Sequence, residues 1–363
     1  MSYISLEVYT NFWILPFLRI FFCLCVIVGH IYIILGLGND SEVIITMQNM
    51  SVDSFFIISG LFMAQSCNKL LNSSDESTSK EYIFLKYQYK RVSKLYPLYI
   101  TTTIIYIAKD ILWGKINLIQ VIDYWPVFFF CGQINGFPNI SGIWYVCSLI
   151  WIGMIISAFI LFWNKKSVVV VFPILIFLTF SYMYMYYGNL SLNAYPMIAN
   201  WFSVGNVKAI CGMSVGVEAY YFVQYYKTYD GQNNISNVIY ICIESIAIVG
   251  IIYCLIVGGL CKRNFLIYPC TTILLILILL RKDYLLKWTS KFPAVKKLGD
   301  ASYATYLCHM IIIECVDYYN IANQYNSKII YLLICVFSFL VGYLLHIMDV
   351  KLRKKIRLSR TLG

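Results

Sequence analysis

The sequence predicts an all-α, polytopic integral membrane protein with about ten transmembrane helices and both termini in the cytoplasm. Three observations predict this fold class. Hydrophobic residues make up 60% of the 363 residues and charged residues only 12%, about half the share expected in a soluble domain. The apolar residues gather in runs long enough to cross a bilayer. The basic residues gather in alternate connections between these runs, which is the pattern of the positive-inside rule.

Ten apolar runs are candidates for membrane spans. They lie at 15–37, 51–67, 95–112, 142–163, 167–187, 203–223, 237–259, 265–280, 302–319 and 328–348. The aromatic stretch at 125–130 is a candidate for an extra re-entrant segment, so the count is ten, give or take one. No polar stretch is long enough for a separate soluble core. We therefore expect residues 1–363 to form a single membrane domain.

The distribution of Lys and Arg predicts the orientation. With the N-terminus inside, 22 of the 28 basic residues lie on the cytoplasmic side and five outside, while Lys208 lies within the sixth run. Cytoplasmic loops thus explain the net charge of +11, and we expect membrane lipid rather than nucleic acid as a partner. The expected location is the inner (plasma) membrane, as a multi-pass protein.

Three connecting segments have distinct compositions. Residues 68–94 are expected to form a cytoplasmic loop, which begins polar and continues as a basic, aromatic segment along the inner membrane surface. Residues 113–141 are an extracytoplasmic loop, and their Trp, Gly and Pro content favours an ordered cover. Residues 349–363 form a basic cytoplasmic tail, as expected of an anchor beside anionic lipid.

The first apolar run contains an arginine and, eleven residues later, a histidine. On a helix this spacing places Arg19 and His30 on the same face, roughly 16 Å apart along the axis. Arg19 then lies near the inner surface and His30 near mid-depth. An ionisable group inside the membrane usually faces a cavity or a partner, so His30 is a candidate site residue. The alternative is a core histidine that caps a carbonyl.

Three further motifs carry residues that suit a site. The second run contains Asp53 and Ser59, the segment before the third run contains Arg91 and Lys94 one turn apart, and the ninth run ends with His309. Each motif also has a structural interpretation. Asp53 could be an N-cap at the outer surface, Ser59 a close-packing residue, Arg91 and Lys94 topology anchors, and His309 a structural residue of an aromatic helix face.

Taken together, these motifs resemble the acyltransferase 3 family of membrane acyltransferases over nearly the whole chain. The resemblance rests on the Arg-x10-His spacing, D-x-F-F-x-x-S-G, an R-x-x-R-like pair before Tyr-Pro, and S-Y-x-x-Y-L-x-H. It implies an acyl-coenzyme A donor on the cytoplasmic side and a glycan or lipid-linked sugar acceptor. It further implies His30 as the catalytic base or acyl relay with Arg19 as its partner, and Arg91 and Lys94 as the donor-binding pair.

The chain departs from the family pattern at two places. Lys94 stands where many relatives have a second arginine, which keeps the charge but loses the bidentate fork. The tryptophan motif of the fourth run reads Trp144-Tyr145-Val146-Cys147 and lacks the glutamate found in many relatives. These departures favour the polysaccharide-modifying branch of the family and leave the acceptor open.

We therefore expect an O-acyltransferase that moves an acyl group, most simply acetyl, from acyl-coenzyme A to a sugar of a cell-surface glycan or exopolysaccharide, without a metal. The alternatives are a non-catalytic polysaccharide exporter or flippase on the same scaffold, and a polysaccharide polymerase. Other polysaccharide-synthesis proteins or a second copy of the chain are further partners to consider. The sequence does not choose partners for the intramembrane charges Lys208, Glu218 and Glu244.

Overall fold

A computed structural model provides the fold of the chain. It describes residues 14–35, 41–75, 77–132, 140, 142–163, 165–190, 197–199, 201–229, 236–256, 261–325 and 327–361. The ends of two expected spans, 36–37 and 257–259, lie outside these residues, as do positions 133–139 and 141 of the expected outer loop.

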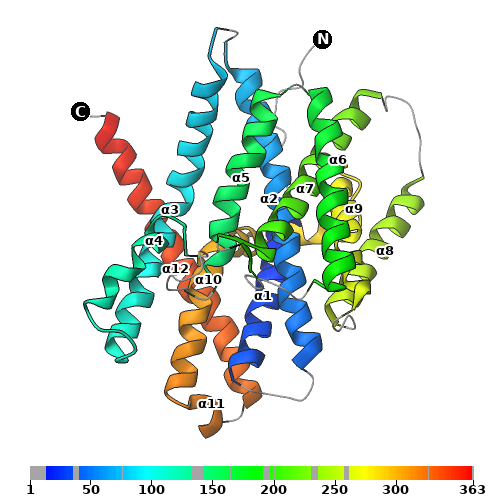
Figure 1. The fold of residues 1–363 in the computed structure, drawn as a ribbon. Coiled ribbons are helices and arrows are strands. Elements are labelled where there is room, and N and C mark those ends of the chain that lie inside the picture. Colours follow the sequence, from blue (N-terminus) through cyan, green and yellow to red (C-terminus); the bar gives the residue numbers. More distant parts are fainter. Residues whose placement is uncertain are drawn as a thin grey trace.

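The described chain is almost entirely helical (Figure 1). The α-helices are α1 (Ile14–Ile34), α2 (Ser41–Ser73), α3 (Lys80–Leu112), α4 (Trp125–Phe128), α5 (Trp144–Phe162), α6 (Lys165–Tyr182), α7 (Val204–Tyr229), α8 (Asn237–Ile256), α9 (Ile267–Leu280), α10 (Pro293–Tyr318), α11 (Ile321–Gln324) and α12 (Ser327–Thr361). Short turns of other helix types are η2 (Gln120–Tyr124), η3 (Met183–Tyr187), η4 (Lys262–Leu266) and η5 (Lys287–Lys291). Strands β1 (Met197–Ala199) and β2 (Phe202–Ser203) form one small antiparallel pair.

Each of the ten apolar runs corresponds to a different long helix, namely α1, α2, α3, α5, α6, α7, α8, α9, α10 and α12. Within the part of the chain that the structure describes, seven segments are long and apolar enough to cross a membrane. The remaining helices α3, α7 and α10 carry more charge, as at Lys296, Lys297 and Asp300 near the start of α10. The chain is thus an all-α, multi-pass membrane protein, while the ten-span count and the side of each terminus stay predictions.

The expected loop at 68–94 is largely helical, which corrects its boundaries. Helix α2 continues to Ser73, and α3 begins at Lys80, where the Ser79 hydroxyl caps the helix by accepting from the Tyr82 N–H at 3.3 Å. The basic, aromatic segment is therefore continuous with the third span and does not form a separate surface helix. Pro97 lies inside α3 rather than in its first turn.

Glycines let the central helices pack closely. A Cβ atom at Gly60 of α2 would collide with the backbone of Met213 in α7, and one at Gly216 of α7 would collide with the backbone of Ile57 in α2. Small residues at such contacts are typical of membrane helices, because they let the two backbones approach. Gly60 is thus a close-packing residue, and α2 lies directly against α7.

Helices α1, α10 and α12 form a second group, which Figure 1 shows side by side. The start of α10 lies against the start of α1, since a side chain at Gly299 would meet Pro16. Farther along the same two helices, the Cys23 thiol lies 3.7 Å from the Ser302 carbonyl oxygen. Helices α1 and α10 therefore run parallel to each other, in the same direction, along this contact.

A buried ion pair links α2 to α7. The Lys208 ammonium lies 3.1 Å from the Asp53 carboxylate, and both side chains are fully buried. The Tyr268 hydroxyl donates to Asp53 at 3.0 Å, and Lys208 also donates to the Leu190 carbonyl at 2.8 Å. Asp53 lies well inside α2, which begins at Ser41, so the interpretation of Asp53 as an N-cap was wrong. The structure instead gives Lys208 a partner that the sequence did not identify.

Glu244 of α8 also finds its partners in the fold. Its carboxylate accepts the backbone N–H groups of Tyr284, Leu285 and Leu286 at 2.7–3.1 Å, and its side chain is fully buried. Three charge-assisted hydrogen bonds satisfy a buried carboxylate well. Glu244 therefore holds the segment that follows α9 and is not available to a site.

The ends of the expected loops are ordered where the structure describes them. In the segment at 113–141, the Tyr99 hydroxyl of α3 donates to the Val127 carbonyl at 2.6 Å, and the Trp151 indole of α5 donates to the Phe130 carbonyl at 3.1 Å. Val127 is fully buried. The segment around α4 thus packs on α3 and α5.

At the other end of the chain, the basic tail is helical, because α12 continues to Thr361.

Candidate active site

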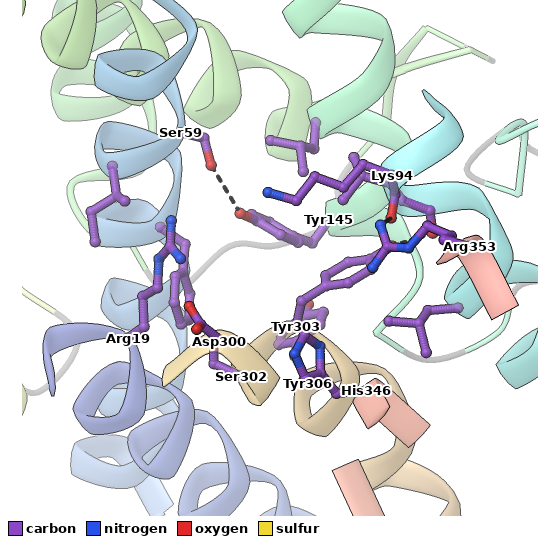
Figure 2. Close-up of a pocket in the computed structure, with 15 residues that line it drawn as sticks. Arg19, Ser59, Lys94, Tyr145, Asp300, Ser302, Tyr303, Tyr306, His346 and Arg353 are labelled. Atoms are coloured by element: carbon purple, nitrogen blue, oxygen red, sulfur yellow. Dashed lines mark hydrogen bonds between the residues drawn. The ribbon is translucent and has the colours of Figure 1, made fainter. Parts of the chain in front are cut away.

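A cavity of about 190 Å³ lies where helices α1, α2, α3, α5, α10 and α12 meet (Figure 2). Its wall combines charged side chains with aromatic rings and hydroxyl groups. The residues that line it are Arg19, Phe55, Ile58, Ser59, Lys94, Leu95, Leu98, Tyr145, Leu149, Asp300, Ser302, Tyr303, Tyr306, His346 and Arg353. Side chains from distant parts of the sequence therefore converge on a single space.

The cavity wall contains three cations from three helices. Among the described residues that line the cavity, Arg19, Lys94 and Arg353 are positive and Asp300 is negative. Figure 2 shows Arg19 and Asp300 at one edge of the cavity and Lys94 and Arg353 at the opposite edge. The excess of positive charge favours an anionic ligand.

Arg19 is held between α2 and α10. Its guanidinium lies 5.1 Å from the centre of the Phe62 ring, which is the geometry of a cation–π contact. Asp300 of α10 lies near enough for a favourable charge interaction. The sequence prediction that Arg19 belongs to a site is consistent with its place in the cavity wall.

Another part of the cavity wall is built by three tyrosines. The Tyr145 hydroxyl lies 3.4 Å from the Ser59 hydroxyl, and the rings of Tyr145 and Tyr306 are 5.2 Å apart, edge to face. The Tyr306 hydroxyl donates to the Gly142 carbonyl at 3.0 Å, and the Tyr303 hydroxyl donates to the Leu95 carbonyl at 3.2 Å. These bonds fix the rings, so this wall of the cavity is preorganised.

Behind this wall lie two histidines that face each other. The ring centroids of His30 on α1 and His309 on α10 are 5.2 Å apart, with 44° between the ring planes. His309 is fully buried, and its ring centroid is 5.6 Å from that of Tyr306, which lines the cavity. Tyr306 therefore links the cavity wall to the histidine pair.

The protonation of His309 follows from its backbone contact. Its Nδ1 lies 2.5 Å from the Tyr306 carbonyl oxygen, and a carbonyl only accepts, so Nδ1 carries the proton. A neutral His309 then presents the lone pair of Nε2. This buried nitrogen has no hydrogen-bond partner among the described residues. The fold thus holds a second imidazole acceptor beside His30.

Arg91 is separated from its expected partner Lys94. Its guanidinium donates to the Leu149 carbonyl of α5 at 2.7 Å and to the Tyr87 hydroxyl at 3.3 Å. It packs on Gly153, where a Cβ atom would collide with the guanidinium. Within the described chain, Lys94 lines the cavity and Arg91 does not. Asp53 also lies away from the cavity, in its ion pair with Lys208.

The sequence did not point to several residues of the cavity wall, among them Tyr145, Tyr303, Arg353 and His346. Tyr145 and Tyr303 belong to the Trp-Tyr-Val-Cys and S-Y-x-x-Y-L-x-H motifs, so their positions could have been inferred. Arg353 could not, because it is one of six basic residues of the tail, and nothing in its spacing sets it apart. His346, which lines the cavity near Arg353, likewise gave no signal beyond its place near the end of a span.

Comparison with known families identifies the class of protein. Residues 13–347 match the family model of the acyltransferase 3 family, described as an acyltransferase domain. The match covers nearly the whole chain and confirms the resemblance seen in the motifs. Neither the curated proteins nor the solved structures include a match to the chain. The chain belongs to the acyltransferase 3 family and is a membrane acyltransferase.

Proposed function

We propose that the protein transfers an acyl group from acyl-coenzyme A, bound from the cytoplasmic side of the plasma membrane, to a hydroxyl group of a cell-surface or exopolysaccharide sugar. Acetyl is the simplest group to expect. The observation that carries the proposal is one arrangement: a cavity edged by Arg19, Lys94 and Arg353, with the His30–His309 pair behind its aromatic wall.

The charged edge of the cavity suits the donor. Coenzyme A is a polyanion, and Arg and Lys side chains bind phosphate through charge-assisted hydrogen bonds. The cations lie at the edges of the cavity, and the tyrosines lie between them (Figure 2). We therefore place a phosphate group at the cations, with the thiol arm directed toward the tyrosines.

The histidine pair suits the transfer step. In the proposed step, His30 takes the proton from the acceptor hydroxyl as its oxygen attacks the thioester carbonyl. The carbon–sulfur bond then breaks, and the coenzyme A thiolate leaves and is protonated. Imidazole has the near-neutral basicity that this role needs. A relay, in which His30 itself carries the acyl group before the acceptor takes it, uses the same residue and the same donor.

A polysaccharide exporter or flippase, the alternative function, would require different residues in the cavity. An exporter needs no cation cluster for a nucleotide-bearing thioester on the cytoplasmic side. The combination of the three cations with a nearby histidine pair therefore favours chemistry over transport.

The test is an assay of the purified protein with radiolabelled acetyl-coenzyme A. We expect release of coenzyme A and appearance of label in a glycan or lipid-linked sugar fraction. The matched control is the His30→Ala protein at equal concentration. Absence of both donor binding and thioester cleavage in the folded wild-type protein would contradict the proposal.

A further inference from the structure

We infer that Arg353, on the cytoplasmic extension of α12, is a donor-binding residue that holds a phosphate group of acyl-coenzyme A. This inference rests on the proposed function and names a part of the donor site that the family motifs do not contain. The family match ends at residue 347, so Arg353 lies beyond the matched residues, on the same helix α12.

The geometry places Arg353 at the cavity and holds it there. Its Nη1 donates to the Lys94 carbonyl of α3 at 3.2 Å, and its Nη2 pairs with the Asp349 carboxylate one turn earlier on α12. The first contact brings the guanidinium beside Lys94, as Figure 2 shows. The two anchors fix the side chain before a ligand arrives, which lowers the entropy lost on binding.

Arg353 retains the capacity to bind an anion. A guanidinium has five N–H donors in a rigid fork, and the two contacts above use only part of them. The side chain is half-buried and lines the cavity together with Lys94 and Arg19. A fork of donors beside a second cation matches the geometry of a phosphate group better than an isolated surface cation does.

The neighbouring basic residues of α12 supply the comparison. Lys351, Lys354 and Lys355 are exposed and, among the described residues, are not part of the cavity wall. They lie on the same helix, carry the same charge, and would serve equally well as anchors beside anionic lipid. If Arg353 were only such an anchor, replacing Arg353 and replacing one of these lysines would change coenzyme A binding by the same amount.

The experiment measures equilibrium binding of coenzyme A and of pantetheine, which lacks the nucleotide and its phosphates, to full-length protein in nanodiscs of neutral lipid. We expect Arg353→Ala to weaken coenzyme A binding roughly tenfold or more, as the loss of a charge-assisted bond to phosphate does, and to leave pantetheine binding unchanged. Lys354→Ala should leave both unchanged. Arg353→Lys should restore part of the affinity.

A variant of the neighbouring carboxylate separates binding from helix stability. Asp349→Asn removes the negative charge beside Arg353 but keeps a side-chain oxygen that can accept from the guanidinium, so the guanidinium stays in place. We expect it to bind coenzyme A as well as the wild type or more tightly. The inference is overturned if Asp349→Asn and Arg353→Ala weaken binding equally, since Arg353 would then act only through the fold of α12.

Three further outcomes would overturn the inference, and they are distinct. An Arg353→Ala effect that appears only when the nanodiscs contain anionic lipid would make Arg353 a lipid-binding residue. Wild-type protein that binds no coenzyme A would end the proposed function and this inference with it. Wild-type binding combined with equal affinity in Arg353→Ala and Lys354→Ala would end the inference alone.

Discussion

The His309 ring lies 5.2 Å from the His30 ring and is fixed by the carbonyl of Tyr306, one turn earlier on its own helix. Of the two histidines, only His309 has a hydrogen bond to a backbone carbonyl among the described residues. The two imidazoles therefore differ in how firmly their rings are held.

This difference predicts unequal effects of replacing the two histidines. His30→Ala should abolish measurable transfer, because loss of a general base typically lowers the rate by about 10² to 10⁴. His309→Ala should lower the rate less and should lower the free energy of unfolding, since the ring is fully buried. Turnover at matched membrane abundance measures the first effect and thermal unfolding the second. Near wild-type turnover in His30→Ala would exclude the proposed mechanism.

The second prediction concerns Lys94. Its side chain lines the cavity, so Lys94→Ala should raise the Michaelis constant for acyl-coenzyme A roughly tenfold, as expected for the loss of a phosphate contact. Lys94→Arg should be tolerated, because it keeps the charge and adds a fork. Lys90→Ala, at an exposed position of the same helix, is the matched control. An equal Michaelis constant for acyl-coenzyme A in the Lys90 and Lys94 variants would show that Lys94 does not bind the donor.

Arg91 is expected to behave differently from Lys94. Arg91→Ala removes one hydrogen bond that joins α3 to Leu149 of α5 and one to Tyr87 within α3, at a cost of about 1.5–3 kcal/mol for each bond that a charged group makes. We expect a lower unfolding temperature and a smaller change in the Michaelis constant for donor than in Lys94→Ala. A large rise in that constant without loss of stability would instead return Arg91 to the donor site.

The ion pair between Asp53 and Lys208 gives a prediction about stability. Lys208→Met leaves the Asp53 carboxylate buried without its cation, which typically costs about 3–5 kcal/mol. The double variant Asp53→Asn with Lys208→Met should recover much of this loss, because neither charge remains. Thermal unfolding of the three proteins in one detergent decides the matter. A double variant no more stable than Lys208→Met would show that the pair is not the source of the effect.

The orientation of the chain remains to be measured. The 22-to-five distribution of basic residues predicts that tags at Ser73 and at the C-terminus react only from the cytoplasm, while a tag at Asn139 reacts from outside. Asn139 itself lies outside the described residues. Labelling of intact cells with an impermeant reagent is the measurement. Labelling of the C-terminal tag under these conditions would contradict the topology.

Local patterns in the sequence predicted the features of the structure that depend on neighbouring residues. Hydrophobic runs located the ten long helices, because apolar length is a local property. Local patterns also identified Arg19, Ser59 and Lys94, each of which lines the cavity. The sequence could not predict which residues pair when they lie far apart along the chain. Asp53 and Lys208 are separated by 155 positions, and only the packing of α2 on α7 brings them together.

Two misjudged features have physical causes. Arg91 and Lys94 are one turn apart, and the motif suggested a joint role, but Gly153 leaves room on α5 for the Arg91 guanidinium alone. The 68–94 segment was expected to lie along the membrane surface because its aromatic and basic residues alternate with a helical period. The same period suits a helix that leaves the membrane, and α3 runs through without a break.

The length of α2 and α3 has a consequence for handling the protein. Each helix has 33 residues and is therefore about 50 Å long, whereas a hydrocarbon core is about 30 Å thick. On this estimate, the helix ends next to their connection, at Ser73 and Lys80, extend beyond the hydrocarbon core. An epitope or a small reporter domain inserted between these helix ends should therefore be exposed to solvent. An antibody could then bind it without contacting the bilayer.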